Sequence, residues 1–488
     1  MNPQVSFLLN KALESLRGSN LDSAELYLKQ AIRLEAKNPH VLRLLGVIAG
    51  QRKECLAAID YFNASLKILP KNPLTLSNLG NIYFELHDYK SALDAFDRAI
   101  KLDSKYEEAW YNKGNVLFEM GQYDDALLQH DRALQLKPNY CEALTNKGLA
   151  LHELMRFNEA INHYDLALSL NPNHHEASWN KSLTLLLQGD LANGFPLYES
   201  RWKSNLASAT AGKRIFENPK WLGVESLQDK TILLYGEQGL GDFIQFSRYV
   251  KFVSKLGAKV ILEVPSELAG IMANLKGVSN VVIRGDALPD FDYQCPLASL
   301  PYAFKTEIGN VPSSEAYIKF EDVFKNTNWE NKLGPKNKPR IGLVWSGNPK
   351  HKNDRNRTLP LREILPYLPD NFQYVSLQKE VRETDRATLE ENSHILNIAS
   401  DLVDFSDTAA LINCLDLVIS VDTSVAHLAG AMGKKAWVLL PYVPDWRWLL
   451  DRNDSPWYLS MRLFRQQSQA NWAPVFDKIR EFLESENL

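Results

Sequence analysis

Small residues recur along the first part of the chain at a constant spacing of 34 residues, with larger apolar side chains between them. Small side chains at fixed offsets let two helices of a hairpin approach closely, while Leu, Tyr and Phe fill the seam. Three series share one register: Gly46, Gly80, Gly114 and Gly148; Ala24, Ala58, Ala92, Ala126 and Ala160; and Ala31, Ser65, Ala99, Ala133 and Ala167. The pattern predicts about five helical hairpins and a degenerate sixth ending near Trp202.

From about residue 225 the 34-residue period stops, and short apolar runs alternate with helical patterns. Continuous apolar runs of this length are typical of buried parallel strands. A polar stretch at Asn326–Asn337, within an irregular region from Pro301 to Pro339, predicts an interdomain linker. We therefore expect two open α/β domains that face each other across a cleft. The predicted strands are Thr231–Tyr235, Ala258–Val264, Val281–Ile283, Asp292–Cys295, Arg340–Trp345, Phe372–Leu377, Leu417–Val421 and Ala436–Leu440.

The stretch Leu417–Leu440 predicts a strand, a turn, a helix and a second strand. Asp422, Thr423 and Ser424 have N-cap chemistry, and the short helix that follows ends at Gly433. In such a unit the carboxyl end of the strand and the helix N-terminus offer N–H groups to an anion. An ordinary capped helix would give the same local pattern.

Two further loops carry polar residues just past a predicted strand. In GEQGLGD (Gly236–Asp242), Gly239 and Gly241 permit close backbone approach, and Asp242 stands at a helix start, where it is either a site residue or simply a capping carboxylate. The spacing differs from the GxGxxG pattern, so a dinucleotide site is disfavoured.

The strand Arg340–Trp345 runs into a basic loop that is framed by Gly347, Asn348 and Pro349. A cationic loop opposite the Thr423 helix would clamp a diphosphate from two sides, whereas a solvated basic loop is the simpler alternative. Its basic residues are Lys350, Lys352, Arg355 and Arg357.

Polar residues also follow two other predicted strands. Because ligands of open α/β sheets bind beyond the carboxyl ends of the strands (the strand-end rule), we expect these residues on the same side as the Thr423 turn. Gln378 and Lys379 follow the strand Phe372–Leu377, and Asp445–Arg447 follow the strand ending at Leu440. The aromatic and cationic residues among the latter could frame a sugar or base, or could serve packing.

Composition narrows the possible functions. The chain has 488 residues, of which 45% are hydrophobic and 23% charged, and a net charge of −4. That balance gives no general electrostatic attraction to nucleic acid or to an anionic membrane. No apolar run approaches the ~18 residues of a membrane-spanning helix, and the N-terminal stretch lacks a signal-peptide pattern. Four widely spaced cysteines are typical of a reducing compartment, so we expect a cytoplasmic protein without a cysteine metal site.

Taken together, these motifs support a family resemblance. The repeats resemble tetratricopeptide (TPR) repeats. GLGD (Gly239–Asp242), DTSVAHLAGAMG (Asp422–Gly433) and NDRNRTLP (Asn353–Pro360) resemble motifs of the two-domain GT-B glycosyltransferases, nearest to the heptosyltransferase group. WRWLLDRNDSPWY (Trp446–Tyr458) is similar to the tail of bacterial proteins that fuse such repeats to a transferase. The resemblance implies an α-helical TPR superhelix over residues 1–205, followed by an α/β GT-B fold with Rossmann-like domains at 225–330 and 338–488.

The resemblance also implies a chemistry: inverting transfer from a nucleotide sugar, without a metal or another cofactor. By position, Asp242 would be the general base, and Thr423 and Ser424 would bind the diphosphate. Arg357 would stabilise phosphate charge, although heptosyltransferases usually have lysine there. His427 would lie one helical turn further along, as a site residue or as a histidine of the core.

A series of asparagines lies on the predicted first helices of the repeats. Asn78, Asn112, Asn146 and Asn180 keep the same spacing. A carboxamide offers both a donor and an acceptor to an extended peptide backbone. The series resembles the asparagine ladder of O-linked N-acetylglucosamine transferases, whereas asparagines that simply face water are the alternative.

Three functions are consistent with these observations. We expect an enzyme that glycosylates a polypeptide held on the concave face of the repeats, and the resemblance implies flagellin-type or other bacterial surface proteins as acceptors. The second possibility is a transferase that acts on a lipid or oligosaccharide, with the repeats serving assembly. The third is a non-catalytic repeat adaptor whose transferase half is degenerate.

Overall fold

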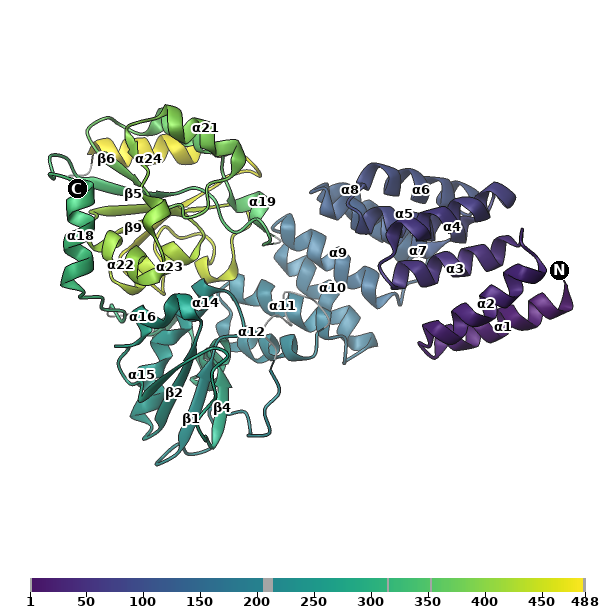
Figure 1. Cartoon of the computed structure of the whole chain (residues 1–488), viewed down its shortest axis with the longest axis horizontal. Helices are drawn as coiled ribbons and strands as arrows, with labels where there is room; N and C mark the ends of the chain where they lie inside the picture. Colours follow the sequence, from purple (N-terminus) through teal and green to yellow (C-terminus); the bar gives the residue numbers. More distant parts are fainter. Residues whose placement is uncertain (1, 205–213, 314–315, 352, 486–488) are drawn as a thin grey trace. The chain divides into compact units, whose positions relative to one another are not determined.

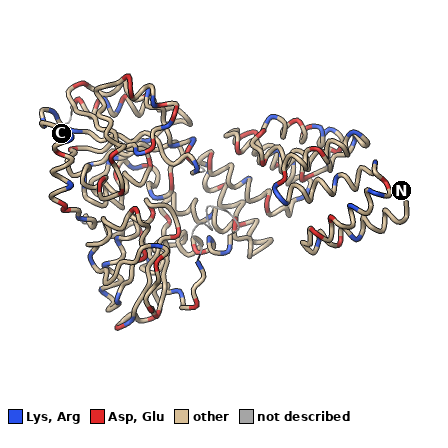
Figure 2. The backbone as a smooth tube through the Cα atoms, in the orientation of Figure 1, with Lys and Arg blue, Asp and Glu red and all other residues tan. Residues whose placement is uncertain are grey.

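The computed structural model describes residues 2–204, 214–313, 316–351 and 353–485. The chain divides into two compact units, Met1–Asn180 and Lys181–Leu488. The predicted end of the repeat domain, residue 205, lies outside the described residues. Among those residues, no helix is both long and apolar enough to cross a membrane. Lys and Arg residues are interspersed with Asp and Glu residues along both units (Figure 2).

The first unit is a series of antiparallel helix pairs (Figure 1). Asn38 and Asn72 cap the starts of two first helices, each just before a proline at the first helical position. The helices are α1 (Pro3–Arg17), α2 (Leu21–Leu34), α3 (Pro39–Gln51), α4 (Cys55–Ile68), α5 (Pro73–Glu85), α6 (Tyr89–Leu102), α7 (Glu107–Glu119), α8 (Tyr123–Leu136), α9 (Cys141–Glu153) and α10 (Phe157–Leu170). The predicted hairpins are therefore confirmed.

Each repeat glycine faces an aromatic ring of the second helix in its pair. A Cβ added at Gly46 would lie 2.6 Å from the ring of Phe62. The same contact recurs as Gly80–Phe96, Gly114–His130 and Gly148–Tyr164. The periodic glycines thus give the rings room to pack across the hairpin, as the small-residue pattern predicts.

The second unit begins with a shorter helix pair, α11 (His175–Leu187, which starts before the division) and α12 (Leu191–Tyr198), and the turn η1 (Glu199–Trp202). A four-stranded parallel sheet follows and forms the first lobe, in the order β3-β2-β1-β4. Its elements are β1 (Thr231–Tyr235), α14 (Leu240–Phe246), α15 (Val250–Lys255), β2 (Lys259–Val264), α16 (Ala269–Met272), β3 (Asn280–Ile283), β4 (Tyr293–Pro296) and α17 (Leu300–Ala303).

The second lobe is a six-stranded parallel sheet in the order β10-β9-β8-β5-β6-β7. Its central strands are buried along their length, as expected for a parallel sheet covered on both faces. The elements are α18 (Val323–Leu333), β5 (Arg340–Val344), α19 (Asp354–Arg357), α20 (Leu361–Ile364), β6 (Gln373–Ser376), α21 (Glu383–Glu391), β7 (Ile395–Leu396), α22 (Phe405–Asn413), β8 (Leu417–Val421), α23 (Ser424–Ala431), β9 (Ala436–Leu440), β10 (Met461–Arg465) and α24 (Ala473–Ser485).

Both sheets have a topological switch point, where the strand order reverses. In the second lobe it lies between β5 and β8, and in the first lobe between β1 and β4. Ligands of open α/β sheets bind in the crevice beyond the carboxyl ends of the strands at such points. The basic loop after β5, the Thr423 turn after β8 and the loop after β1 all follow switch-point strands.

The predicted linker is wrong over most of its length, because Val323–Leu333 forms helix α18. Asp322 caps its start by accepting from the Lys325 N–H at 2.9 Å. Trp329 and Leu333, one turn apart, are both buried. The segment is rich in Asn and Lys, so its composition is typical of a loop. Its apolar face consists of only these two buried residues, which is too few to indicate an amphipathic helix from the sequence.

His130 allows a test of the aromatic packing in the first unit. It is fully buried, neither ring nitrogen has a partner among the described residues, and burial lowers its pKa to about 4. The unfolded chain therefore binds a proton more readily, and this group makes stability fall as the pH drops from about 7 toward 4. We expect His130→Phe, which copies Phe62 and Phe96, to stabilise the first unit at every pH. The extra gain at pH 5 over pH 8 should be about 2 kcal/mol in chemical denaturation.

Tyr164→Phe is the matched control, because it changes the equivalent ring without a group that titrates between pH 5 and pH 8. A gain for His130→Phe that is the same at both pH values would contradict the assignment of a buried neutral imidazole.

Candidate active site

The predicted base, Asp242, lies at the start of α14, just after the loop that follows β1. Gly239 is the N-cap of this helix, and its N–H donates to Asp242 Oδ2 at 2.9 Å. A carboxylate that accepts the N-cap N–H stabilises a helix start. Helix capping, one of the two roles that the sequence left open for Asp242, therefore occupies one of its two oxygens.

The other oxygen of Asp242 faces the second lobe. Arg447, in the turn η8 (Trp446–Trp448), donates through Nη2 to Asp242 Oδ1. Arg447 also donates to Asp445 Oδ1, from Nη1 at 2.8 Å and from its backbone N–H at 3.0 Å. Its guanidinium lies over the ring of Trp446, 4.4 Å from the centroid. The carboxylate after the first strand of lobe one thus points at lobe two.

The charges of this cluster depend on one another. Burial raises the pKa of Asp242, Arg447 opposes that shift, and Asp445 adds to it. Burial lowers the pKa of Arg447, but Asp242 and Asp445 together raise it well above its usual value, so the guanidinium stays charged. The side chain of Asp242 keeps 25% of its surface exposed, which leaves room for a partner molecule.

The amino end of α23 lies directly against α14. A Cβ added at Gly241 would lie 2.8 Å from His427 Cδ2 and 3.5 Å from the Cα of Ser424. Thr423 is the N-cap of α23, and its hydroxyl lies 3.1 Å from the Ser420 hydroxyl. Thr423 and Ser424 both remain partly exposed. Two lobes that are far apart in sequence therefore meet at the helix starts that the sequence singles out.

His427 is buried behind this contact. Its Nδ1 lies 2.9 Å from the Tyr458 hydroxyl, and its ring stacks on Trp448 with centroids 5.2 Å apart. Burial lowers its pKa to about 3, with Arg447 adding to the effect, so the imidazole is neutral at physiological pH. Its Nε2 lies 3.8 Å from Asp422 Oδ1. Burial also raises the pKa of Asp422 to about 6, and the charge of Asp445 contributes.

Arg357, in the basic loop, reaches the start of α23. Its Nη1 donates to the backbone carbonyl of Asp422 at 2.8 Å, and its guanidinium packs against Gly347. Arg355 and Asn348 are exposed at the surface, where Asn348 Oδ1 accepts from the Lys350 N–H at 2.9 Å. Lys352 lies outside the described residues. Of the described residues of the predicted cationic cluster, Arg357 thus lies at the start of α23, whereas Lys350 and Arg355 lie at the surface.

Gln378 and Lys379 are engaged by the protein itself. Gln378 Oε1 accepts from the backbone N–H groups of Trp345 and Ser346, at 3.3 and 3.0 Å. Its Nε2 donates to the Glu380 carbonyl at 3.1 Å. Lys379 Nζ donates to the Val403 carbonyl at 2.7 Å. In this structure Gln378 fixes the backbone at the end of β5, and Lys379 links the loop after β6 to the loop that contains Val403.

Buried donors without a hydrogen-bond partner gather around the start of α23. In the described part of the chain they are the Ser346 Oγ and Arg357 Nε, and the latter lies 3.6 Å from Asp354 Oδ1. Ser346 lies two residues beyond the end of β5, and Arg357 donates to the Asp422 carbonyl through Nη1. Such donors cost free energy unless a ligand or water supplies an acceptor. Their chemistry fits a phosphate or another oxygen-rich ligand.

The four ladder asparagines lie on α5, α7, α9 and α11, the first helices of their pairs. Asn78 and Asn112 are half-buried, whereas only 9% of Asn180 is exposed. Asn146 Nδ2 donates to Asn115 Oδ1 at 2.8 Å and to the Tyr111 hydroxyl at 3.1 Å. Asn78 and Asn112 are therefore better placed to meet a peptide than Asn146 and Asn180.

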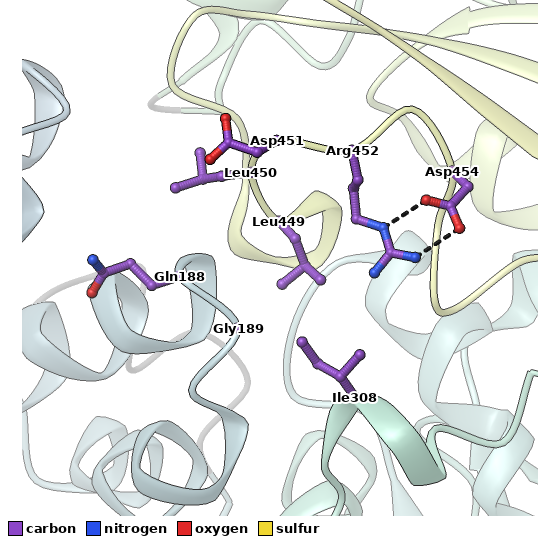
Figure 3. A pocket seen from close by; sticks show the side chains of 8 residues that line it. All are labelled: Gln188, Gly189, Ile308, Leu449, Leu450, Asp451, Arg452 and Asp454. Atoms are coloured by element: carbon purple, nitrogen blue, oxygen red, sulfur yellow. Dashed lines mark hydrogen bonds and ion pairs between the residues drawn. The ribbon is translucent and has the colours of Figure 1, made fainter.

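A cavity of about 540 Å³ lies beside this site (Figure 3). Leu449–Arg452 and Asp454, which follow η8, line one side, and Gln188, Gly189 and Ile308 line the other. Leu449 and Asp451 have φ angles of 54° and 49°, in the left-handed region, which is strained for Leu449 and which aspartate tolerates more readily. Arg465 holds this loop by donating to the carbonyls of Trp448, Leu449 and Arg452.

Sequence reasoning missed several residues around Asp242. Tyr198 and Gln238 contact each other beside Arg447, and Tyr458 contacts His427. Asp445 and Arg447 were placed on the donor side by the strand-end rule, but nothing in the sequence pairs Arg447 with Asp242. That pairing joins residues about 200 positions apart, and no local pattern records it.

Gly241 offers a direct test of the contact between the lobes. Helix propensity alone favours Ala over Gly by about 1 kcal/mol inside a helix. Because the new Cβ would meet the buried His427 ring, we instead expect Gly241→Ala to destabilise the second unit by about 1–3 kcal/mol. Gly309→Ala, whose Cβ meets nothing within 4 Å, is the control and should change stability little in the same denaturation experiment. A stabilised Gly241→Ala variant would show that the two helix starts do not pack together in solution.

Comparisons with known proteins bear on both halves of the chain. Tetratricopeptide-repeat profiles match residues 9–73, 80–121, 107–140 and 141–174. The profile of glycosyltransferase family 9 (heptosyltransferase) matches residues 375–439. That segment contains Gln378, Lys379 and the start of α23, but neither Asp242 nor Arg357.

Protein FlbA of Caulobacter vibrioides is 26% identical over 326 residues, which is 60% of this chain and 52% of that protein. The chain thus spans about half the length of the curated relative it matches. Among solved structures, a tetratricopeptide repeat protein from Parabacteroides merdae is 20% identical, with a TM-score of 0.36, over 42% of this chain and 82% of that one. PilF of Pseudomonas aeruginosa is 18% identical, with a TM-score of 0.38, over 41% and 91%. The chain therefore joins tetratricopeptide repeats to two parallel α/β lobes, and the second lobe contains the segment that matches glycosyltransferase family 9.

Proposed function

We propose that the chain is an inverting, metal-independent glycosyltransferase that moves a sugar from a nucleotide-activated donor to a hydroxyl of a protein acceptor. The observation that carries this proposal is the meeting of two helix starts across the lobes. One bears the carboxylate Asp242, and the other bears Thr423 and Ser424 near Ser346 Oγ and Arg357 Nε, which have no hydrogen-bond partner among the described residues. A base and an anion site on facing lobes are the two parts that such a transfer needs.

The donor diphosphate would bind at the start of α23. The first N–H groups of a helix are free to bind an anion, and the helix dipole favours negative charge there. The hydroxyls of Thr423 and Ser424 and the Arg357 guanidinium would add donors to the same phosphates. These groups would supply the positive charge that a metal ion provides in other transferases.

The reaction would be a single displacement. The acceptor oxygen forms a bond to the anomeric carbon from the face opposite the diphosphate, so the configuration inverts. The bond from that carbon to the diphosphate oxygen breaks, and the nucleoside diphosphate leaves. Asp242 accepts the proton of the attacking hydroxyl, which is worth about 10²–10⁴-fold in rate.

The contacts of Asp242 are compatible with this role. Each of its oxygens makes one contact, to Arg447 or to the Gly239 N–H, and a carboxylate oxygen has two lone pairs. An acceptor hydroxyl can therefore bind without displacing Arg447. The guanidinium also favours the ionised carboxylate, which is the form that acts as a base.

The repeats are the proposed acceptor-binding region, since tetratricopeptide repeats indicate protein–protein interaction. The asparagines that keep accessible carboxamides, Asn78 and Asn112, are the residues we assign to the peptide backbone.

Two variants test whether Asp242 and Arg357 have separate roles, in proton transfer and in binding of the nucleotide. We expect Asp242→Asn to lower transfer about 10²–10⁴-fold and to leave nucleotide binding unchanged. Arg357→Gln should weaken binding of the nucleoside diphosphate about 10–100-fold, through loss of a charge-assisted hydrogen bond. The assays are product release from a panel of nucleotide sugars and thermal shift with the matching nucleotides. Arg362→Gln, an exposed arginine on α20, is the control for charge. A panel with no thermal shift and no turnover would favour the non-catalytic adaptor.

A second experiment tests the acceptor. The double variant Asn78→Ala, Asn112→Ala should raise KM for a polypeptide acceptor several-fold, while hydrolysis of the donor by water stays within twofold. Asn63→Ala, an exposed asparagine on the second helix α4, is the control. Unchanged transfer to a polypeptide in the double variant would favour a lipid or oligosaccharide acceptor, and a collapse of donor hydrolysis would contradict separate roles for repeats and cleft.

A further inference from the structure

The segment that ends the repeat region, Tyr198–Trp202, is built into the first lobe. Arg201 is completely buried, and its guanidinium lies between the rings of Tyr198 and Trp202, 4.7 and 4.8 Å from their centroids. An arginine is rarely buried unless its donors are paired.

Every nitrogen of this guanidinium meets an acceptor, and the acceptors belong to two regions of the chain. Nε and Nη2 donate to Glu237 Oε1 at 3.2 and 2.8 Å, and Nη2 donates to the Ser299 hydroxyl at 2.6 Å. Nη1 donates to Glu199 Oε1 at 2.6 Å and to the Tyr198 carbonyl at 3.1 Å. Glu237 and Ser299 follow β1 and β4, the switch-point strands of the first lobe.

Glu237 depends on this partner. It is buried in the loop between β1 and α14, and burial raises its pKa while Arg201 opposes the shift. A buried carboxylate that loses its arginine becomes protonated or moves toward water. Arg201 therefore fixes the conformation of the loop Gly236–Gly239, which leads directly into Asp242.

Tyr198 makes a second contact with the same loop. Its hydroxyl lies 3.0 Å from Gln238 Oε1 and 2.8 Å from Gln238 Nε2. Gln238 Oε1 in turn lies 3.5 Å from Arg447 Nη2, the atom that contacts Asp242. The Tyr198 ring also packs on Trp446, with centroids 6.0 Å apart.

We propose that Tyr198 and Arg201 are positioning residues, through which the last helical segment of the repeat region holds the Gly236–Gly239 loop and orients Asp242 and Arg447. This inference rests on the proposed function for its catalytic consequence. It makes the end of the repeat region part of the transferase lobe. Removal of residues 1–205 would therefore disrupt the site itself, whichever acceptor the enzyme uses.

The test is Tyr198→Phe in the full chain, with Tyr249→Phe as the matched control. Both tyrosines are buried, with exposed fractions of 2% and 1%, and both bond through the hydroxyl, Tyr249 to Thr306 Oγ1 at 2.7 Å. Each variant loses one hydroxyl and keeps its ring. Hydrogen exchange of a peptide that spans Gly236–Phe246 should become at least about fivefold faster in Tyr198→Phe and should be unchanged in Tyr249→Phe.

Turnover supplies the second measurement. We expect Tyr198→Phe to lower kcat about five- to twentyfold, with KM for the nucleotide sugar within twofold. The acidic limb of its pH profile should move to higher pH, because a displaced Arg447 favours the ionised form of Asp242 less. Tyr249→Phe should keep the wild-type profile.

The outcomes separate the two proposals. Equal exchange and equal pH profiles in Tyr198→Phe and the wild type would overturn the positioning role, while a large loss in Asp242→Asn would still support the transferase. Conversely, if the wild type turns over no nucleotide sugar, the proposed function fails. Hydrogen exchange alone then decides whether Tyr198 positions the loop.

Discussion

The contact between Arg447 and Asp242 is the interaction on which the arrangement of the candidate site depends. Arg447 is buried in the second lobe, and its charge is matched by Asp445 beside it and by Asp242 on the first lobe. Removing one member of a buried ion pair leaves an uncompensated charge, so each lobe favours the other in its observed position. The close approach of Gly241 to His427, which only a residue without a side chain permits, lies beside this pair.

Sequence patterns were sufficient for most of the fold, because repeats and buried strands are local features. The 34-residue spacing follows from the packing of Gly46 on Phe62 and of its counterparts, and two of the four switch-point strands, β1 and β8, match their predicted bounds. Helix starts at Asp242 and Thr423 follow from turn chemistry a few residues long. The family resemblance is supported by the profiles that match the repeats and residues 375–439.

The remaining features depend on contacts between distant segments. Gln378 and Lys379 follow a strand end, as a ligand-binding residue would, but their side chains bond to Ser346 and Val403. The strand-end rule places a residue at an edge and does not say whether its side chain meets protein or ligand. The linker was mispredicted because burial of Trp329 and Leu333 outweighs a composition typical of loops.

In the proposed mechanism the base and the phosphate site lie on separate lobes, so catalysis would depend on how the lobes are held, because general-base catalysis requires hydrogen-bond distance to the reacting hydroxyl. In this chain the first lobe is fixed from two directions. Arg447 contacts Asp242 from the second lobe, and Arg201 contacts Glu237 from the segment after α12. The loop between Glu237 and Asp242 is only a few residues long, so neither contact can shift without moving the other. Under the proposed function, a polypeptide bound on the repeats would influence the base through Arg201 by moving α12, which makes the junction after α12 the place where acceptor binding and catalysis would be coupled.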